Sequence, residues 1–123
     1  QRTVARTTVT VTGLGPFDDV KIPNFAQTPE VILDVITLDS SACAPCLYML
    51  DAAIKASEAT GVPTRVVEHK IKSREGIGYM MAMGVQNIPT ICIDGEAKFI
   101  SQIPSTPDLV KAIEEAARRA GKA

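Results

Sequence analysis

The sequence has no tryptophan, one histidine and only three cysteines, and aromatic residues make up 4% of its 123 positions. A core without tryptophan and with few aromatic rings has to be filled mainly by aliphatic side chains. Three cysteines are too few, and odd in number, for the disulfide cross-links that stabilise small secreted domains. At this length folding buries roughly two-thirds of the surface of the unfolded chain, so one domain is expected to be stable without disulfides or a structural metal.

Long apolar runs and runs of basic residues are also missing. No apolar stretch approaches the ~20 residues that span a bilayer, which argues against a membrane segment. The formal net charge is −1, and no basic stripe is present to neutralise phosphates, so nucleic acid is not an expected partner. The chain starts at Gln1, without a Met or a signal-like apolar segment, and we expect a processed protein or part of a larger polypeptide.

What the sequence does contain is a closely spaced pair of thiols, Cys43 and Cys46, separated by Ala44 and Pro45. The apolar run at 31–38 precedes them, and a helical pattern follows. A thiol at the start of a helix becomes acidic, and the two-residue spacing lets the second sulfur close a disulfide. Such a pair is also half of a zinc site, but the strand–turn–helix setting favours redox chemistry.

Hydrophobic periodicity and turn residues predict the order of elements along the chain. The expected strands are 3–12, 31–38, 64–71, 90–93 and 97–103, and the expected helices are 43–60, 74–83 and a last one from Thr106. A long connection covers 13–29, and Asp94-Gly95 is expected to turn a hairpin. The order predicts an α/β domain with a parallel first βαβ unit and helices on both faces of a mixed sheet.

Local patterns also predict the faces and ends of the helices. Ser73 and Thr106 are the expected N-cap residues of the second and third helices. The residues that recur at helical spacing in the first helix are Leu47, Leu50, Ile54 and Ser57.

This order of elements, with the 43–46 motif opening the first helix and Ile88-Pro89-Thr90 opening the next-to-last strand, resembles the thioredoxin-like superfamily. The resemblance covers about residues 31–120. It implies a three-layer α/β/α sandwich with a mixed sheet of four to five strands and an extra N-terminal strand. Residues 1–30 would then be an N-terminal strand and linker, and residues 31–123 the thioredoxin-like domain. It also implies a cis Ile88–Pro89 bond.

The sequence departs from the family's pattern at several positions. Ala42 stands where the oxidoreductases commonly have Trp, and Ala44 where Gly is common. Thr37 occupies the position of the buried Asp of thioredoxins, and Lys70 falls near the lysine that would pair with that acid. These differences predict a divergent thioredoxin/glutaredoxin-type domain rather than a housekeeping thioredoxin.

Cys43 is the candidate nucleophile, and Cys46, one helical turn inward, is the candidate resolving thiol and should be less exposed. Lowering a thiol pKa from ~8.5 to ~7 requires ~2 kcal/mol. The helix dipole supplies ~0.3–1 kcal/mol. N–H groups of the first helical turn and the Cys46 thiol therefore have to hydrogen-bond the Cys43 sulfur as well.

The resemblance also implies a substrate-binding surface beside the thiols. Pro89 would face the pair, and the backbone of Ile88 would pair with an extended segment of a partner. Ala44 and Pro45 complete this surface, and Pro45 fixes φ and offers no N–H of its own.

We therefore expect a thiol–disulfide oxidoreductase module that exchanges disulfides with a protein partner and takes electrons from a reductase or a dithiol. No cofactor and no metal are expected, and the cysteine usage fits a reducing, cytoplasmic compartment, although an oxidising one stays open. Two alternatives also stay open. One is a metal- or cluster-binding module using Cys43, Cys46 and Cys92, for which His69 is the sole histidine. The other is a non-catalytic docking domain of a larger enzyme.

Simpler roles are expected for the remaining polar and sulfur-containing residues. Cys92 is expected to be a small buried hydrophobe, and His69 a satisfied surface or edge residue. Asp39 is expected to be a solvated strand-end residue, with a proton relay to Cys46 as the alternative. The methionines of the second helix, Met80, Met81 and Met83, are expected to fill the core, with a partner-binding rim as the alternative.

Overall fold

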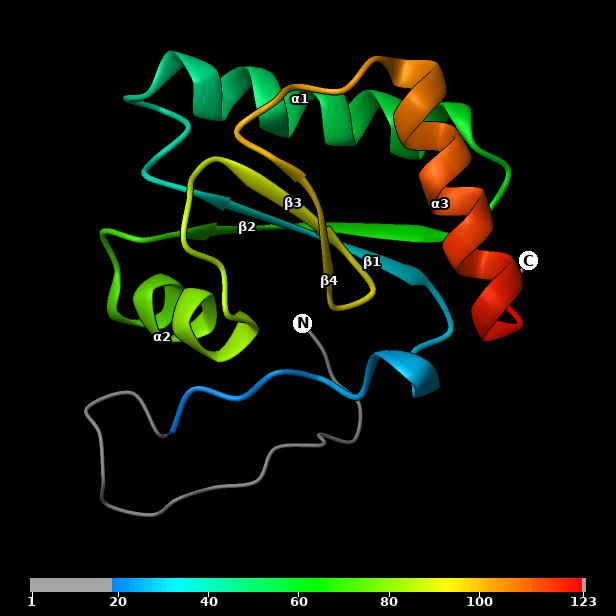
Figure 1. The fold of residues 1–123 in the computed structure, drawn as a ribbon, viewed down its shortest axis with the longest axis horizontal. Helices are drawn as coiled ribbons and strands as arrows, with labels where there is room; N and C mark the ends of the chain where they lie inside the picture. The colour runs from blue at the N-terminus through cyan, green and yellow to red at the C-terminus, as the bar shows by residue number, and fades with distance from the viewer. Residues whose placement is uncertain (1–18, 123) are drawn as a thin grey trace.

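A computed structural model of the chain describes residues 19–122, so the strand expected at 3–12 lies outside the described residues. The elements in order are η1 (Phe25–Gln27), β1 (Val31–Thr37), α1 (Ala44–Ala59), β2 (Thr64–Lys70), α2 (Arg74–Met83), β3 (Thr90–Ile93), β4 (Glu96–Ile100) and α3 (Thr106–Ala120) (Figure 1). Every strand and helix expected after residue 30 is present.

The strands of residues 19–122 form one open, mixed sheet in the order β2-β1-β3-β4. β1 is parallel to β2, and β3 is antiparallel to both β1 and β4. The hairpin between β3 and β4 turns at Asp94 (φ 46°) and Gly95 (φ 87°), two left-handed residues of the kind that tight hairpins require. The predicted α/β class, the parallel βαβ unit and the hairpin are confirmed.

β1 is the central strand on which the domain is built, and all seven of its residues are buried. Alternate residues of a strand point to opposite faces, so β1 supplies two cores. Val31, Leu33 and Val35 lie in a cluster with residues of α1 and α3. Ile36 lies in a second cluster, with Tyr79 of α2. A strand covered on both faces has to be apolar nearly throughout, which explains its continuous hydrophobic run.

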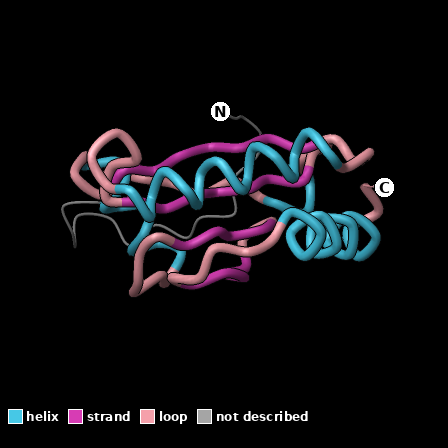
Figure 2. The backbone as a smooth tube through the Cα atoms, turned by 90° about the horizontal axis from the view of Figure 1, so that it is seen from above, coloured by secondary structure: helices cyan, strands magenta, loops and turns pink. Residues whose placement is uncertain are grey.

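The helices cover both faces of this sheet, as expected. α1 and α3 lie on one face and α2 on the other (Figure 1). Figure 2 shows α1 extended along the strands that it covers. Because α1 follows β1, its first turn lies at the end of the sheet where β1 finishes.

The buried face of α1 differs from the residues that the helical spacing picked out. Leu47 and Ile54 are 41% and 39% exposed, whereas the buried residues of the helix are Cys46, Met49, Ala52, Ala53 and Ala56. Small alanine side chains allow the helix to approach β1 and α3 closely, so the helix turns this face inward. The spacing was right about Leu50, which packs partly buried against this core, and wrong about Leu47 and Ile54.

Two element boundaries also differ from the sequence-based expectation. Ser105, not Thr106, caps α3, because its hydroxyl accepts a hydrogen bond from the Asp108 N–H. β4 ends at Ile100 rather than continuing to residue 103, because Ser101 has a left-handed φ of 59° that turns the chain. The expected Ser73 cap of α2 is confirmed.

Candidate functional site

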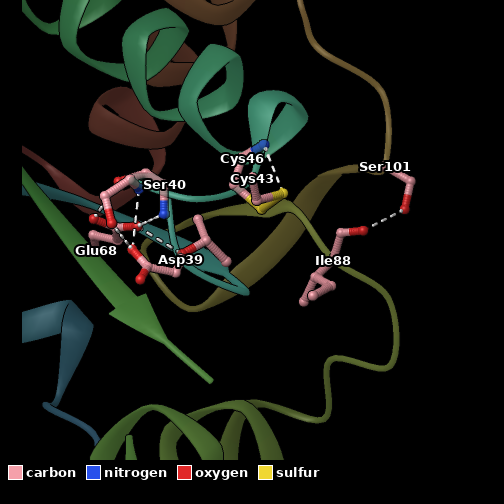
Figure 3. The surroundings of a disulfide bond; sticks show 9 residues. Asp39, Ser40, Cys43, Cys46, Glu68, Ile88 and Ser101 are labelled. Carbon is pink, nitrogen blue, oxygen red and sulfur yellow. Dashed lines mark hydrogen bonds between the residues drawn. A yellow bond between two sulfur atoms is a disulfide. The ribbon is translucent and has the colours of Figure 1, made fainter. Parts of the chain in front are cut away.

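Cys43 and Cys46 are joined by a disulfide at the mouth of α1, with their Cα atoms 5.2 Å apart (Figure 3). Cys43 is the N-cap residue of the helix and has an extended backbone. The Cys46 N–H donates to the Cys43 sulfur over 3.4 Å. This contact is one of the first-turn donors that an acidic Cys43 thiol requires, and it comes directly from the helix start.

The two sulfur-bearing residues differ in their access to solvent. Cys46 is only 1% exposed, while Cys43 is half-buried and Ala44 and Pro45 are exposed. Cys46 faces inward because it lies on the buried face of α1, and Cys43 precedes the helix. A visiting thiol or disulfide can therefore approach Cys43 but not Cys46, as expected.

The segment before β3 lies at the same end of the sheet as the disulfide. Ile36 of β1 is opposite Thr90 of β3, so Pro89 lies level with the end of β1, from which the loop to Cys43 departs. The Ile88–Pro89 bond is cis, as expected. Pro89 is buried and Ile88 is half-buried. In Figure 3, Ile88 lies on the other side of the sulfur pair from Asp39 and Glu68.

Ser101 holds this segment in place and was not foreseen from the sequence. Its N–H donates to the Pro89 carbonyl over 2.8 Å, and its hydroxyl donates to the Ile88 carbonyl over 3.4 Å. Within residues 19–122 the Ile88 N–H donates to no acceptor. Among these residues it is a backbone donor without an acceptor.

Glu68 of β2 binds the loop between β1 and α1, and sequence reasoning missed it. Its carboxylate accepts from the Thr37 hydroxyl over 2.7 Å, from the Ser40 N–H over 3.0 Å and from the Ser40 hydroxyl over 2.9 Å (Figure 3). Burial opposes the charge, but these hydrogen bonds and the nearby Lys70 outweigh it and lower the pKa of Glu68. Thr37, the position matched to the family's buried acid, is itself buried and donates to this carboxylate.

Asp39 is buried, at 2% exposed, and not solvated as expected. Its carboxylate accepts from the N–H and hydroxyl of Ser41 and pairs with Lys70 and Lys72, whose side chains cover it. The hydrogen bond from Lys72, together with those from Ser41, holds the pKa of Asp39 well below its usual range. Asp39 therefore stays ionised at neutral pH, which argues against the alternative of a proton relay to Cys46.

A second polar network lies on the α2 face of the sheet and centres on Asp34. One Asp34 oxygen is 2.7 Å from His69 Nε2, and the other accepts from the Tyr79 hydroxyl over 2.8 Å. His69 Nδ1 is 3.0 Å from Glu75. The His69 and Tyr79 rings stack with centroids 3.7 Å apart. Gly76 permits this approach of α2, because a Cβ there would collide with the Lys70 carbonyl.

His69 is a satisfied edge residue, as expected, but it is buried and not on the surface, at 5% exposed. Both of its ring nitrogens face carboxylates, and both can donate only when the ring is protonated. Burial opposes that charge, but the hydrogen bond and charge of Asp34, with those of Glu75, raise the pKa of His69. The network thus holds the His69 ring between two carboxylates, which favour its protonated form.

Cys92 does not join the other two cysteines. It is fully buried, as expected, and lies in the cluster on the α2 face, whereas Cys46 belongs to the buried face of α1. Burial, and secondarily the charge of Asp34, raises the pKa of the Cys92 thiol to about 12. His69 is likewise on the α2 face, bound to Asp34. The ligand set of the metal-binding alternative is therefore split between two faces, and no cluster of metal ligands occurs anywhere in residues 19–122.

The three methionines of α2 divide between core and surface. Met80 and Met83 are partly buried against the α2-face cluster, as core filling requires. Met81 is 63% exposed and fills no core. Across the described part of the chain, no helix has the length and apolar character to cross a membrane.

Comparison with known proteins adds no further assignment. No family model matches the chain, and no curated protein matches it. The chemistry of the site therefore has to be inferred from its geometry.

Proposed function

We propose that this chain is a thioredoxin-like thiol–disulfide oxidoreductase module that exchanges disulfides with a protein partner through Cys43. The observation that carries the proposal is the asymmetry of the sulfur pair. Cys43 is accessible, and its sulfur accepts a hydrogen bond from the Cys46 N–H at the start of α1, while the Cys46 side chain is buried. The mixed sheet order and the cis proline at the same sheet end support the thioredoxin-like assignment.

The reaction proceeds by two thiol–disulfide exchanges. The Cys43 thiolate of the reduced module attacks one sulfur of a partner's disulfide, which breaks that bond and releases one partner thiolate. The Cys46 thiolate then attacks the Cys43 sulfur, closes the Cys43–Cys46 disulfide and releases the second partner thiolate. The partner gains two electrons and two protons, and a dithiol donor or reductase restores the module by the reverse steps.

The surface around Cys43 suits an extended protein segment. The open Ile88 N–H offers one backbone hydrogen bond to such a segment, in the manner of an added strand. Exposed Ala44 and Pro45 present little bulk beside Cys43, so they leave its sulfur approachable. A partner segment would therefore lie between Pro45 and Ile88 and place its disulfide against Cys43.

Several points stay predictions: the identity of the partner and of the electron donor, the cytoplasmic location, and membership of a larger polypeptide. So does the docking-domain alternative. It differs from the proposal in one respect, because a docking domain would retain its full role after Cys43→Ser.

The proposal is tested by thiol exchange with glutathione and with a disulfide-containing model protein. Wild type and the Cys92→Ala control should exchange, Cys43→Ser should lose exchange completely, and Cys46→Ser should accumulate a mixed disulfide at Cys43. Mass spectrometry identifies the trapped cysteine. Exchange at the wild-type rate by Cys43→Ser, or a folded wild-type pair that neither glutathione nor dithiothreitol reduces, would overturn the proposal.

A further inference from the structure

The loop between β1 and α1, which carries Cys43, is held by hydrogen bonds to its backbone. The N–H of Ser40 donates to Glu68, the N–H of Ser41 donates to the Asp39 carboxylate, and the N–H of Ala42 donates to the Asp39 carbonyl. Three consecutive backbone groups leading to the cysteine are therefore bound. Because the residues between them are also bound, holding Ser40 in place restrains the position of Cys43.

Glu68 is the part of this arrangement that comes from another strand. It lies 28 residues from Ser40 in sequence, on β2, and bonds both the N–H and the hydroxyl of Ser40. The same carboxylate accepts from Thr37, the last residue of β1. Asp39 also links the loop to β2, through an ion pair with Lys70, whose side chain is 42% exposed. An exposed pair of this kind contributes little, so the three hydrogen bonds of Glu68 are the stronger tie between the loop and the sheet.

We infer that Glu68 is a positioning residue for the sulfur pair, holding the β1–α1 loop so that Cys43 stays within bonding reach of Cys46. The inference rests on the proposed function and adds to it a residue that sets the balance between disulfide and dithiol. Cys46 is fixed by its helix, so anchoring the other cysteine raises its effective concentration for ring closure. Anchoring therefore favours the oxidised state.

Glu68→Gln tests this anchoring. The substitution preserves the shape of the side chain, but its amide nitrogen cannot accept the hydrogen bonds that one carboxylate oxygen now accepts. The loosened loop should shift the equilibrium toward the dithiol.

The test is the equilibrium constant for disulfide formation in glutathione redox buffers. Glu68→Gln should lower that constant by about tenfold, which for a two-electron couple is about 30 mV. Ser40→Ala, which loses only one of the hydrogen bonds and keeps all charges, should shift it less and in the same direction. The matched control is Glu58→Gln, an exposed glutamate near the far end of α1, and it should leave the constant unchanged.

Amide hydrogen exchange of the oxidised protein provides a second readout that does not depend on glutathione. The N–H groups of Ser40, Ser41 and Ala42 should exchange faster in Glu68→Gln and not in Glu58→Gln. A variant with a lower melting temperature, unchanged loop exchange and an unchanged equilibrium constant would show that Glu68 is merely structural and overturn the inference. If neither glutathione nor dithiothreitol reduces the wild-type pair, the proposed function fails, while the loop exchange still decides the role of Glu68.

Discussion

Two carboxylate networks on opposite faces of the same sheet differ in what they hold. The Asp34 network joins β1, β2 and α2 through side chains alone, and the side chains of Asp34 and His69 are 2% and 6% exposed. The Glu68 and Asp39 network binds backbone and hydroxyl donors of one loop, beside lysines that reach solvent. The first network secures a helix to the sheet, and the second secures the loop that carries Cys43.

The comparison predicts a separation of effects. Because a buried charge without its partner is strongly unfavourable, substitutions in the Asp34 network should change the free energy of unfolding. Substitutions in the Glu68 network loosen the loop that leads to Cys43, so they should change thiol chemistry more than substitutions in the Asp34 network do.

The largest stability effect is expected from Asp34→Asn. The substitution leaves His69 without one of its two carboxylates and should reduce the free energy of unfolding by about 3 kcal/mol, the lower end of the range for breaking a buried pair, since Glu75 remains. Urea unfolding of the oxidised protein measures the loss. Asp51→Asn, at an exposed site on α1, is the control.

The same Asp34→Asn protein should keep a wild-type alkylation rate at Cys43, because the network lies on the other face of the sheet. Equal stability of Asp34→Asn and wild type would contradict the view that this network secures α2. A strongly altered Cys43 rate in a folded variant would contradict the separation of the two regions.

A smaller effect is expected from Tyr79→Phe. The change removes the hydroxyl that donates to Asp34 and keeps the ring stacked on His69. It should cost about 2 kcal/mol, as for other hydrogen bonds to a buried charge. Unfolding measurements beside Tyr48→Phe, an exposed tyrosine of α1, check this, and equal losses in the two variants would show that the hydroxyl contributes nothing.

The two networks should also differ in pH dependence. The pKa of His69 is raised in the folded protein, so its contribution is complete below its unfolded value of ~6.5 and is lost as pH rises through the folded value. The loss should not exceed ~1.4 kcal/mol per pH unit for one proton. The lowered pKa values of Glu68 and Asp39 have the opposite sign, since their contribution is lost as pH falls through the folded values.

Unfolding free energies of the oxidised protein between pH 5 and 9 test this assignment. The Cys43–Cys46 pair does not titrate in that state. The pKa of Cys92 is raised to about 12 only in the folded protein, and its unfolded thiol ionises near ~8.5, so the assignment to His69 is read from the data below pH ~8. The decline above neutral pH should be present in wild type and nearly absent in Asp34→Asn. An equal decline in both proteins would exclude His69 as its source.

The features predicted from sequence are those with a local signal. A continuous apolar run and turn residues were sufficient for β1, the Asp94-Gly95 hairpin and the position of the sulfur pair before α1. Asp34 and Glu68 were missed because their partners are distant. Asp34 binds residues 35 and 45 positions away, and Glu68 binds a serine 28 positions away. An acid inside an apolar strand signals a buried network, but only the strand register identifies its members.

The buried face of α1 shows the same limit in a different form. Helical spacing favours the bulky Leu47 and Ile54, but close contact with the sheet and α3 selects the alanine-rich face. Which face is buried depends on the distance from α1 to the neighbouring elements, and a short stretch of sequence does not give that distance. The buried face also determines which cysteine points inward, so the helix packing decides the asymmetry of the site.

The central claim is that Cys43 alone is the acidic, accessible thiol, and the pH dependence of alkylation of the fully reduced protein tests it most directly. Iodoacetamide labelling followed by mass spectrometry should show Cys43 modified first, with a pKa below ~8, and Cys46 and Cys92 modified much more slowly. Preferential labelling of Cys46 or Cys92, or a Cys43 rate that titrates only above ~8.5 like an ordinary thiol, would contradict the account.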